Sequence, residues 1–209
     1  MGDILSRVKA ALAGLGELPE HERIEAINAI KRELHQASPF RDEPVDCVLW
    51  VSADLVQGND YNPNKVAPPE MRLLETSILE DGYTQPIVVW EDDGYEVVDG
   101  FHRNRVGKEY PGVRERVRGY LPVTIINNDR QERPDRIAST IRHNRARGKH
   151  QVQAMSEIVL ELARRNWSDK KIGKELGMDP DEVLRLKQIT GLAELFADKE
   201  FSEAWEGGA

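Results

Sequence analysis

The stretch from Tyr95 to Val106, YEVVDGFHRNRV, constrains the fold most, because an apolar strand pattern runs directly into a glycine and then into basic residues. Gly100 has no side chain, so the backbone can approach a ligand closely there, and a helix beginning just after it would present unpaired N–H groups to a phosphate. Arg103 and Arg105 would add forked, charge-assisted hydrogen bonds. We interpret the segment as a strand that ends in an anion-binding turn, and a solvated structural turn is the alternative.

The distribution of charge supports the phosphate interpretation. The whole chain carries a formal net charge of −8. Residues 45–102 hold two Lys or Arg against twelve Asp or Glu, whereas residues 103–149 hold thirteen against five. Positive potential is therefore expected around the basic segment, which favours a phosphate-bearing ligand. A solvated basic face would give the same composition and stays open.

The other segments predict a mixed α and β chain. Apolar residues at helical spacing indicate two amphipathic helices within residues 4–37, whose apolar faces pack on the chain itself, on a second copy in a homodimer, or on a partner protein. Residues 114–118 are expected to form a charged loop. The predicted strands cover residues 45–51, 85–90, 95–99 and 121–126, and further helices cover residues 70–80, 134–147 and 151–165.

Residues 167–189 have the layout of a helix-turn-helix. Ser168 is the expected N-cap, Gly177 makes the turn and Pro180 begins the second helix. Three acids at the start of that helix would face phosphates unfavourably, so a purely structural role for these helices stays open. The candidate DNA contacts are Lys170, Lys171, Arg185, Lys187 and Gln188.

Cysteine content and hydropathy bear on the compartment. Cys47 is the only cysteine, which excludes an intramolecular disulfide. The N-terminus shows no signal-peptide pattern, and no apolar run approaches the length that crosses a bilayer. We expect a cytoplasmic protein with no membrane role.

In their order along the chain, several segments resemble the ParB N-terminal domain of the ParB/sulfiredoxin superfamily. The resemblance covers roughly residues 48–150, and a helical segment follows, as in ParB proteins. It implies an α+β fold, a small mixed sheet with helices, followed by an all-α helix-turn-helix segment. The expected domains are an extension over 1–44, a nucleotide-binding domain over 45–150 and a helical domain over 151–209. The segments are Val51–Leu55, Asn62–Asn64, Leu74–Ile78, Asp81–Val89, Leu121–Ile125 and Arg142–Arg147.

Two ParB motifs carry the implied site. The motif Gly-Glu-Arg-Arg-x-Arg-Ala, which helps to hold the triphosphate of CTP, is partly matched here by Gly-Phe-His-Arg-Asn-Arg. Phe101 stands in place of the family's Glu and His102 in place of its first Arg. The motif Glu-Asn-x-x-Arg is similar to His-Asn-Arg-Ala-Arg, with a histidine in place of the acid that supports magnesium and nucleotide turnover. The resemblance implies binding of ATP or CTP and leaves open hydrolysis and Mg²⁺. The implied phosphate contacts are Gly100, His102, Arg103, Arg105, His143, Asn144 and Arg147.

The same turn is similar to two enzymes of the superfamily. Sulfiredoxin has Gly-Gly-Cys-His-Arg, and Phe101 replaces that cysteine, which excludes thiol chemistry at this site. Free serine kinases have Asp-Gly-His-His-Arg, nearly the sequence from Asp99 to Arg103, and Asp99 would then be a candidate general base.

We predict a nucleotide-binding, DNA-associated regulator, similar to the small ParB-like regulators of prophage or mobile-element genes such as the IbrB type. The alternative is a small-molecule kinase or NTPase. No acidic cluster lies beside the basic segment in the sequence, so neither a metal site nor nuclease activity is expected. His102 and His143 would make phosphate affinity depend on pH near neutrality.

Overall fold

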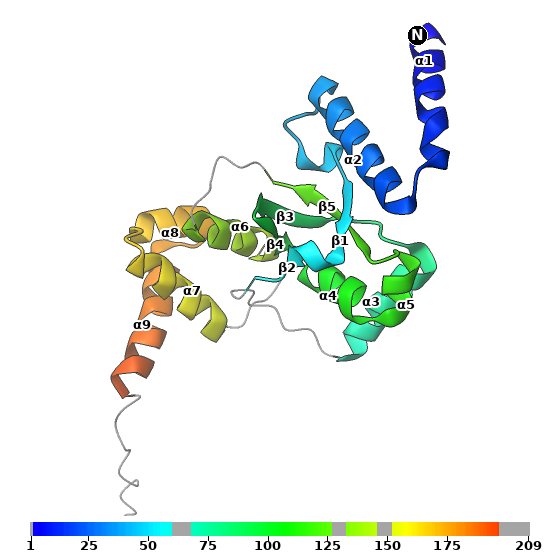
Figure 1. Cartoon of the computed structure of the whole chain (residues 1–209). Helices are drawn as coiled ribbons and strands as arrows, with labels where there is room; N and C mark the ends of the chain where they lie inside the picture. The colour runs from blue at the N-terminus through cyan, green and yellow to red at the C-terminus, as the bar shows by residue number, and fades with distance from the viewer. Residues whose placement is uncertain (1, 60–67, 127–132, 146–151, 197–209) are drawn as a thin grey trace, which may run out of the picture. The chain divides into compact units, whose positions relative to one another are not determined.

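The computed structural model describes residues 2–59, 68–126, 133–145 and 152–196 (Figure 1). They fall into two compact units, one that contains the described residues up to 126 and one that contains those from 133 onward. No helix among these described residues is long and apolar enough to cross a bilayer.

The first unit holds the sheet and its surrounding helices. Its elements are α1 (Gly2–Leu12), η1 (Ala13–Glu17), α2 (Glu20–Ala37), η2 (Pro44–Asp46), β1 (Leu49–Ser52), η3 (Ala53–Leu55), β2 (Val56–Gln57), α3 (Pro68–Asp81), β3 (Ile87–Asp92), β4 (Gly94–Asp99), α4 (Phe101–Glu109), α5 (Pro111–Arg116) and β5 (Tyr120–Ile125). The second unit contains α6 (Arg133–Arg145), α7 (Val152–Arg164), α8 (Asp169–Leu176) and α9 (Pro180–Phe196).

The five strands form one mixed sheet in the order β1-β5-β3-β4-β2. The β1–β5 and β3–β4 pairs are antiparallel, whereas β3–β5 and β2–β4 are parallel. Alternating apolar residues of the strands build the core of this unit, with Leu49, Ile87 and Val123 almost fully buried. The predicted α+β fold is confirmed.

The helix α2 packs along β1 through polar contacts. The side-chain amide of Asn28 accepts from the backbone N–H of Trp50 at 3.1 Å and donates to the carbonyl oxygen of the same residue at 2.7 Å. Lys31 donates to the carbonyl of Val48 at 2.8 Å. The contacts fix the N-terminal extension to the sheet.

The helix α1 diverges from α2 and buries none of its residues (Figure 1). Ile4 is 66% exposed and Leu5 55% exposed, although both lie on the apolar face expected from their spacing. The described residues therefore do not show this apolar face packed within the chain, which was one of the three predicted alternatives.

A second small core joins α3, α4 and α5. Met71 and Ile78 of α3 pack with Val106 of α4 and Val113 of α5. Gly107 allows this close packing, because a Cβ there would lie 2.3 Å from both the Tyr83 hydroxyl and a methyl group of Leu121. Tyr83 lies against α4 and donates from its hydroxyl to the carbonyl of Arg103 at 2.8 Å.

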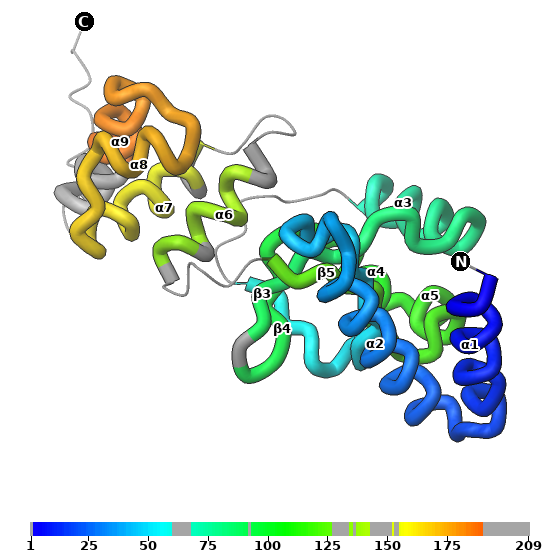
Figure 2. The backbone as a smooth tube through the Cα atoms, turned by 90° about the horizontal axis from the view of Figure 1, so that it is seen from above, coloured from blue at the N-terminus to red at the C-terminus, as the bar shows by residue number. Residues whose placement is uncertain are grey.

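The second unit is a group of helices around an apolar core (Figure 2). Ile137 and Ile141 of α6 contribute to this core together with residues of α7, α8 and α9. The packing therefore groups α6 with the C-terminal helices, twenty residues before the predicted division at residue 150.

Most predicted elements are present, but several local predictions are wrong. The strand predicted over residues 45–51 begins only at Leu49, because Pro44–Asp46 form the short helix η2. Residues 114–116 belong to α5 and not to a loop. Pro111 is favourable at the first position of a helix, and backbone hydrogen bonds from Arg114 to Tyr110 and from Val117 to Val113 continue this helix. The helical spacing of apolar residues also predicts that Leu79 and Leu184 face inward, but their exposed fractions are 37% and 49%. Each lies directly beside a buried residue, Ile78 and Val183, and adjacent residues of a helix point about 100° apart.

Candidate functional site

The turn between β4 and α4 has the geometry expected of an anion site. Gly100 adopts a left-handed conformation with φ of 88° and is the N-cap of α4. The register between β3 and β4 shifts just before it, where Val88 faces Asp99 and Val89 faces Val97. Because Gly100 has no capping side chain, the first N–H groups of α4 have no acceptor from that residue.

Arg103 is held at this helix N-terminus by several contacts. Its guanidinium donates to the side-chain oxygen of Gln85 at 2.8 Å and to the carbonyl of Pro86 at 3.2 Å. A Cβ on Gly100 would lie 2.9 Å from the same guanidinium. The side chain is 17% exposed and its positive charge is fixed beside the turn, which adds to the positive end of the α4 dipole.

Asp99 lies beneath the turn and is 5% exposed. Its carboxylate oxygen Oδ2 is 3.6 Å from a terminal nitrogen of Arg103. A buried carboxylate beside a guanidinium is suited to hold that arginine in position. A general base, in contrast, must contact its substrate. The catalytic role of Asp99 stays a prediction.

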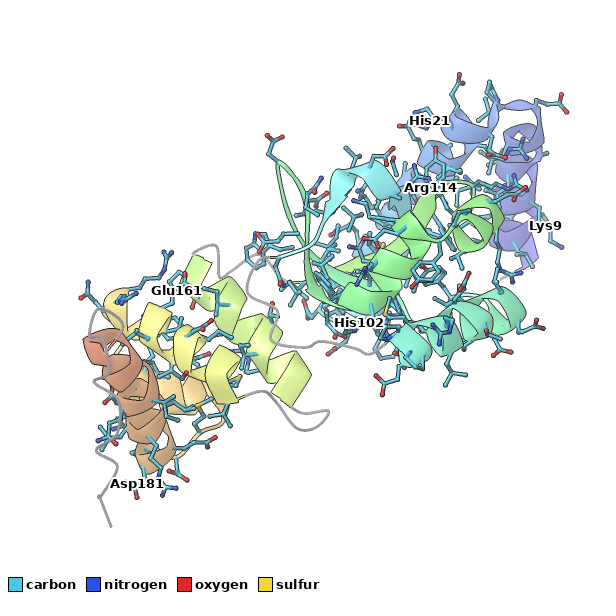
Figure 3. The ribbon with its side chains drawn as sticks, turned by 90° about the horizontal axis from the view of Figure 1, so that it is seen from below. Lys9, His21, His102, Arg114, Glu161 and Asp181 are labelled. Atoms are coloured by element: carbon cyan, nitrogen blue, oxygen red, sulfur yellow. The ribbon has the colours of Figure 1, made fainter. Side chains whose placement is uncertain are left out.

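His102 and Arg105 differ in their surroundings. His102 is half-buried on α4 and contacts the ring of Phe101 edge-on (Figure 3). Burial, and then the charges of Arg105 and Arg103, lower the pKa of His102 below its ordinary value. Arg105 is exposed and pairs with Glu109 one turn later at 2.8 Å, so its guanidinium is free to exchange partners.

The second basic motif lies on the other compact unit. His143 and Asn144 are in the last turn of α6, but their side chains lie outside the described part of the structure. Arg147 lies outside it altogether. Convergence of the two motifs on one phosphate site therefore stays a prediction.

The helix-turn-helix forms as predicted. The Ser168 hydroxyl accepts from the N–H of Lys171 at 3.2 Å, and Gly177 closes α8 with φ of 66°. Ile172, Leu176, Val183 and Leu186 are buried in its core. The Asp179 carboxylate caps α9 by accepting a hydrogen bond from the N–H of Glu182 at 2.8 Å, so this acid has a structural role at the start of the helix.

The candidate DNA contacts divide into two groups. The ammonium group of Lys171 lies 3.8 Å from the ring centre of Trp167, and that of Lys187 pairs with Asp169 at 2.8 Å. Both side chains therefore already interact with residues of the same unit. Lys170, Arg185 and Gln188 are exposed, as is Lys171, whereas Lys187 is partly buried.

The sequence did not single out Gln85 and Pro86 as site residues, although they lie within a segment of the ParB resemblance. A polar residue before a proline at the start of a strand was the only signal available. Among the described residues, no group of three or more His, Cys, Asp or Glu is placed to hold a metal ion.

Comparison with known proteins agrees with this architecture. Residues 41–141 match the ParB N-terminal domain family, and residues 150–198 match the IbrB-like C-terminal HTH domain family. The chain is 61% identical over 193 residues to the uncharacterized protein YbdM of Escherichia coli K12, a match that covers 91% of each chain.

Similar solved structures are more distant. The C-terminally truncated chromosome-partitioning protein ParB of Caulobacter crescentus matches in its complex with CTP-gamma-S, at 17% identity and a TM-score of 0.38, over 71% of this chain and 83% of that chain. Its complex with the centromeric parS site matches at 15% identity and a TM-score of 0.45, over 70% and 75%. The Pnob8-like ParB-N domain matches at 13% identity and a TM-score of 0.47, over 72% and 73%.

The extensive identity to YbdM and the two domain matches, in this order along the chain, place the protein in one family. The chain belongs to the family of YbdM, in which a ParB N-terminal domain precedes an IbrB-like C-terminal helix-turn-helix domain.

Proposed function

We propose that the protein is a DNA-associated regulator whose ParB-like unit binds a nucleoside triphosphate, ATP or CTP, at the N-terminus of α4. The observation that carries this proposal is the pairing, in one chain, of a glycine-initiated basic helix start with a helix-turn-helix domain. The phosphates are bound by the first N–H groups of α4, with charge from Arg103 and Arg105. His143, Asn144 and Arg147 enter this proposal through the second sequence motif alone.

In this proposal the helix-turn-helix binds DNA in the control of transcription or of a mobile element. Lys170, Arg185 and Gln188 are exposed, which supports their role as DNA contacts. Lys171 and Lys187 would have to leave Trp167 and Asp169 in order to reach a phosphate. We therefore assign the main contribution to Lys170, Arg185 and Gln188.

Titration calorimetry with ATP, CTP and ADP, with and without Mg²⁺, tests the nucleotide site. We expect micromolar binding of at least one triphosphate and a large loss in Arg105→Ala, whose side chain is exposed. Release of phosphate, or its transfer to free serine, in the same mixtures would identify the enzyme alternative with Asp99 as base. Absence of binding by all three nucleotides would refute the nucleotide proposal.

A mobility-shift titration with duplex DNA tests the second part. Affinity should fall steeply with salt, because each neutralised phosphate releases a counterion. A chain that binds no duplex even at low salt would instead be a protein-interaction module.

Self-association through α1 is a further part of the proposal. Ile4, Leu5, Val8 and Leu12 are exposed on one helix, and burying them between two copies would remove this apolar surface from water. Light scattering after size-exclusion chromatography should give a dimer for the wild type and a monomer for Leu5→Glu. Ser6→Glu is the control, because Ser6 does not share the apolar face. A monomeric wild type would leave a partner protein as the remaining candidate.

A further inference from the structure

A cavity of about 570 Å³ lies in the first unit, on residues other than those of the α4 turn. Its wall is built from α2, from β1, from the connection between α3 and β3, and from the connection between α5 and β5. Cavities of this size take small organic molecules. The lining residues that matter chemically are Arg23, Arg116, Arg118, Trp50, Tyr83 and Tyr120.

The charge of the cavity is positive. Three arginines line it against one acid, Glu20, which pairs with Arg118. Arg23 donates through one terminal nitrogen to the carbonyl of Leu18 at 3.1 Å, whereas its Nε–H is buried without an acceptor among the described residues. Arg116 is exposed at the rim. The cavity therefore has more donors and positive charge than the protein itself compensates, which favours an anion.

The backbone beside the cavity is held in an uncommon conformation. Arg118 has φ of 56°, a left-handed value that costs an ordinary residue about 1 kcal/mol. Arg118 occupies the position after a helix end where glycine is usual. Its N–H donates to the carbonyl of Glu115, and the N–H of Gly119 donates to the carbonyl of Arg114. Left-handed residues other than glycine concentrate at ligand sites, and here the conformation carries the arginine side chain to the cavity and to Glu20.

Three aromatic residues line the cavity together with Ile24, Gly82 and Val117. Trp50 comes from β1, Tyr83 follows α3 and Tyr120 begins β5. The hydroxyls of the two tyrosines are fixed, since Tyr83 donates to the carbonyl of Arg103 and Tyr120 bonds Nδ1 of His21 at 2.9 Å. Fixed aromatic rings present flat apolar faces, which suit a planar ring.

We propose that this cavity binds a small molecule that combines a planar ring with one anionic group, a carboxylate or a phosphate. The anionic group lies against Arg116 and Arg118, and the ring lies among Trp50, Tyr83 and Tyr120. Such a ligand would be distinct from a triphosphate at the α4 turn, because none of Gly100, His102, Arg103 or Arg105 lines this cavity.

A site-resolved titration of the full chain tests the proposal. The probes are indole-3-acetate for the carboxylate and adenosine 5′-monophosphate for the phosphate, and the signal is the indole N–H resonance of Trp50, assigned with Trp50→Phe. We expect a saturable shift with at least one probe. Failure of both probes to move this resonance up to about 10 mM would overturn the proposal.

Two matched variants separate the cavity from general surface charge. Arg116→Ala removes an exposed arginine that lines the cavity, whereas Arg114→Ala removes an arginine of the same helix that pairs with Asp54 and does not line it. We expect about tenfold weaker binding for Arg116→Ala and no change for Arg114→Ala. Equal losses in both variants would contradict the assignment.

Arg105→Ala separates the cavity from the proposed nucleotide site. The Trp50 shift should persist in this variant, even where binding of a triphosphate at α4 is lost. A Trp50 shift that disappears in Arg105→Ala would show that the probe acts from the α4 turn and would overturn the cavity proposal alone.

Discussion

The guanidinium of Arg103 donates a hydrogen bond of 2.8 Å to the side-chain oxygen of Gln85. With its second bond to the carbonyl of Pro86, this contact ties the first turn of α4 to the segment that enters β3. An arginine expected only to bind phosphate therefore also holds the turn together, and the consequences of removing it are correspondingly larger.

Arg103→Ala should lower both stability and nucleotide affinity. Loss of its bonds, and of the charge beside buried Asp99, is expected to cost about 2 kcal/mol of unfolding free energy, measured by urea denaturation. Arg105→Ala is the matched comparison, because its exposed pair with Glu109 is worth less than about 0.5 kcal/mol. Equal stability of the two variants would contradict the structural role of Arg103.

Gly100→Ala should deform the turn. A side chain there must adopt φ near 88° and would meet the Arg103 guanidinium at 2.9 Å and the Cα of Ile87 at 3.3 Å. We expect a loss of about 1–3 kcal/mol and weaker phosphate binding.

Gly112→Ala is the control for that substitution. Gly112 lies in α5, and a Cβ there meets nothing closer than 3.8 Å. This change should leave stability unchanged or raise it by up to about 1 kcal/mol. A Gly100→Ala variant as stable as Gly112→Ala would show that the turn tolerates a side chain.

The acid stability of the protein should depend on His102. Its pKa in the folded chain is lowered, first by burial and then by Arg105 and Arg103, so between that value and the ordinary 6.5 the unfolded chain binds more protons. Stability is therefore fully present above 6.5 and is lost as the pH falls through this window. Urea denaturation of His102→Gln between about pH 5 and 8 should lack this component.

The lowered pKa of His102 also moves the expected pH dependence of phosphate binding to lower pH. A bound anion favours the protonated imidazole, so affinity should rise on acidification, mainly below the ordinary pKa and not around neutrality. Calorimetry of wild type and His102→Gln over this range measures the difference. An affinity that does not change with pH in the wild type would place His102 outside the site.

DNA affinity should respond oppositely to two exposed residues of α9. Arg185→Ala is expected to weaken duplex binding and to reduce its salt dependence, whereas Asp181→Asn should tighten binding about two- to fivefold at low salt, because one repulsive charge is removed. Asp179 is unsuitable for this test because it caps the helix. Anisotropy titrations that show no change for either variant would place the DNA surface elsewhere.

Local signals in the sequence predicted the parts of the fold that short-range physics controls. The glycine at residue 100, the N-cap at Ser168 and the left-handed Gly177 are each dictated by a few neighbouring residues, and all three occur as expected. The period-2 and helical patterns likewise predicted four of the five strands of the sheet and most helices to within a few residues, but not the two-residue strand β2.

Local sequence signals did not predict the long-range contacts. Nothing in the sequence near Arg103 indicates that Gln85, eighteen residues earlier, receives its hydrogen bond. The cavity combines residues from positions 20 to 120, and two of its arginines, Arg116 and Arg118, lie in the segment predicted as a charged loop. The predicted convergence of the two basic motifs depends on parts of the chain that belong to different compact units, and it stays a prediction.

The paired hydrogen bonds between Asn28 and Trp50 have a consequence for solubility. β1 is the outermost strand on its side of the sheet, and the Asn28 amide takes both backbone groups that Trp50 would offer to an incoming strand. Lys31 takes the carbonyl of Val48 next to it. A chain shortened to begin at residue 45 would leave these groups open, and such unpaired strand edges join one another in aggregates. The N-terminal extension therefore acts as a protective cover that keeps the sheet of one molecule from adding to the sheet of the next.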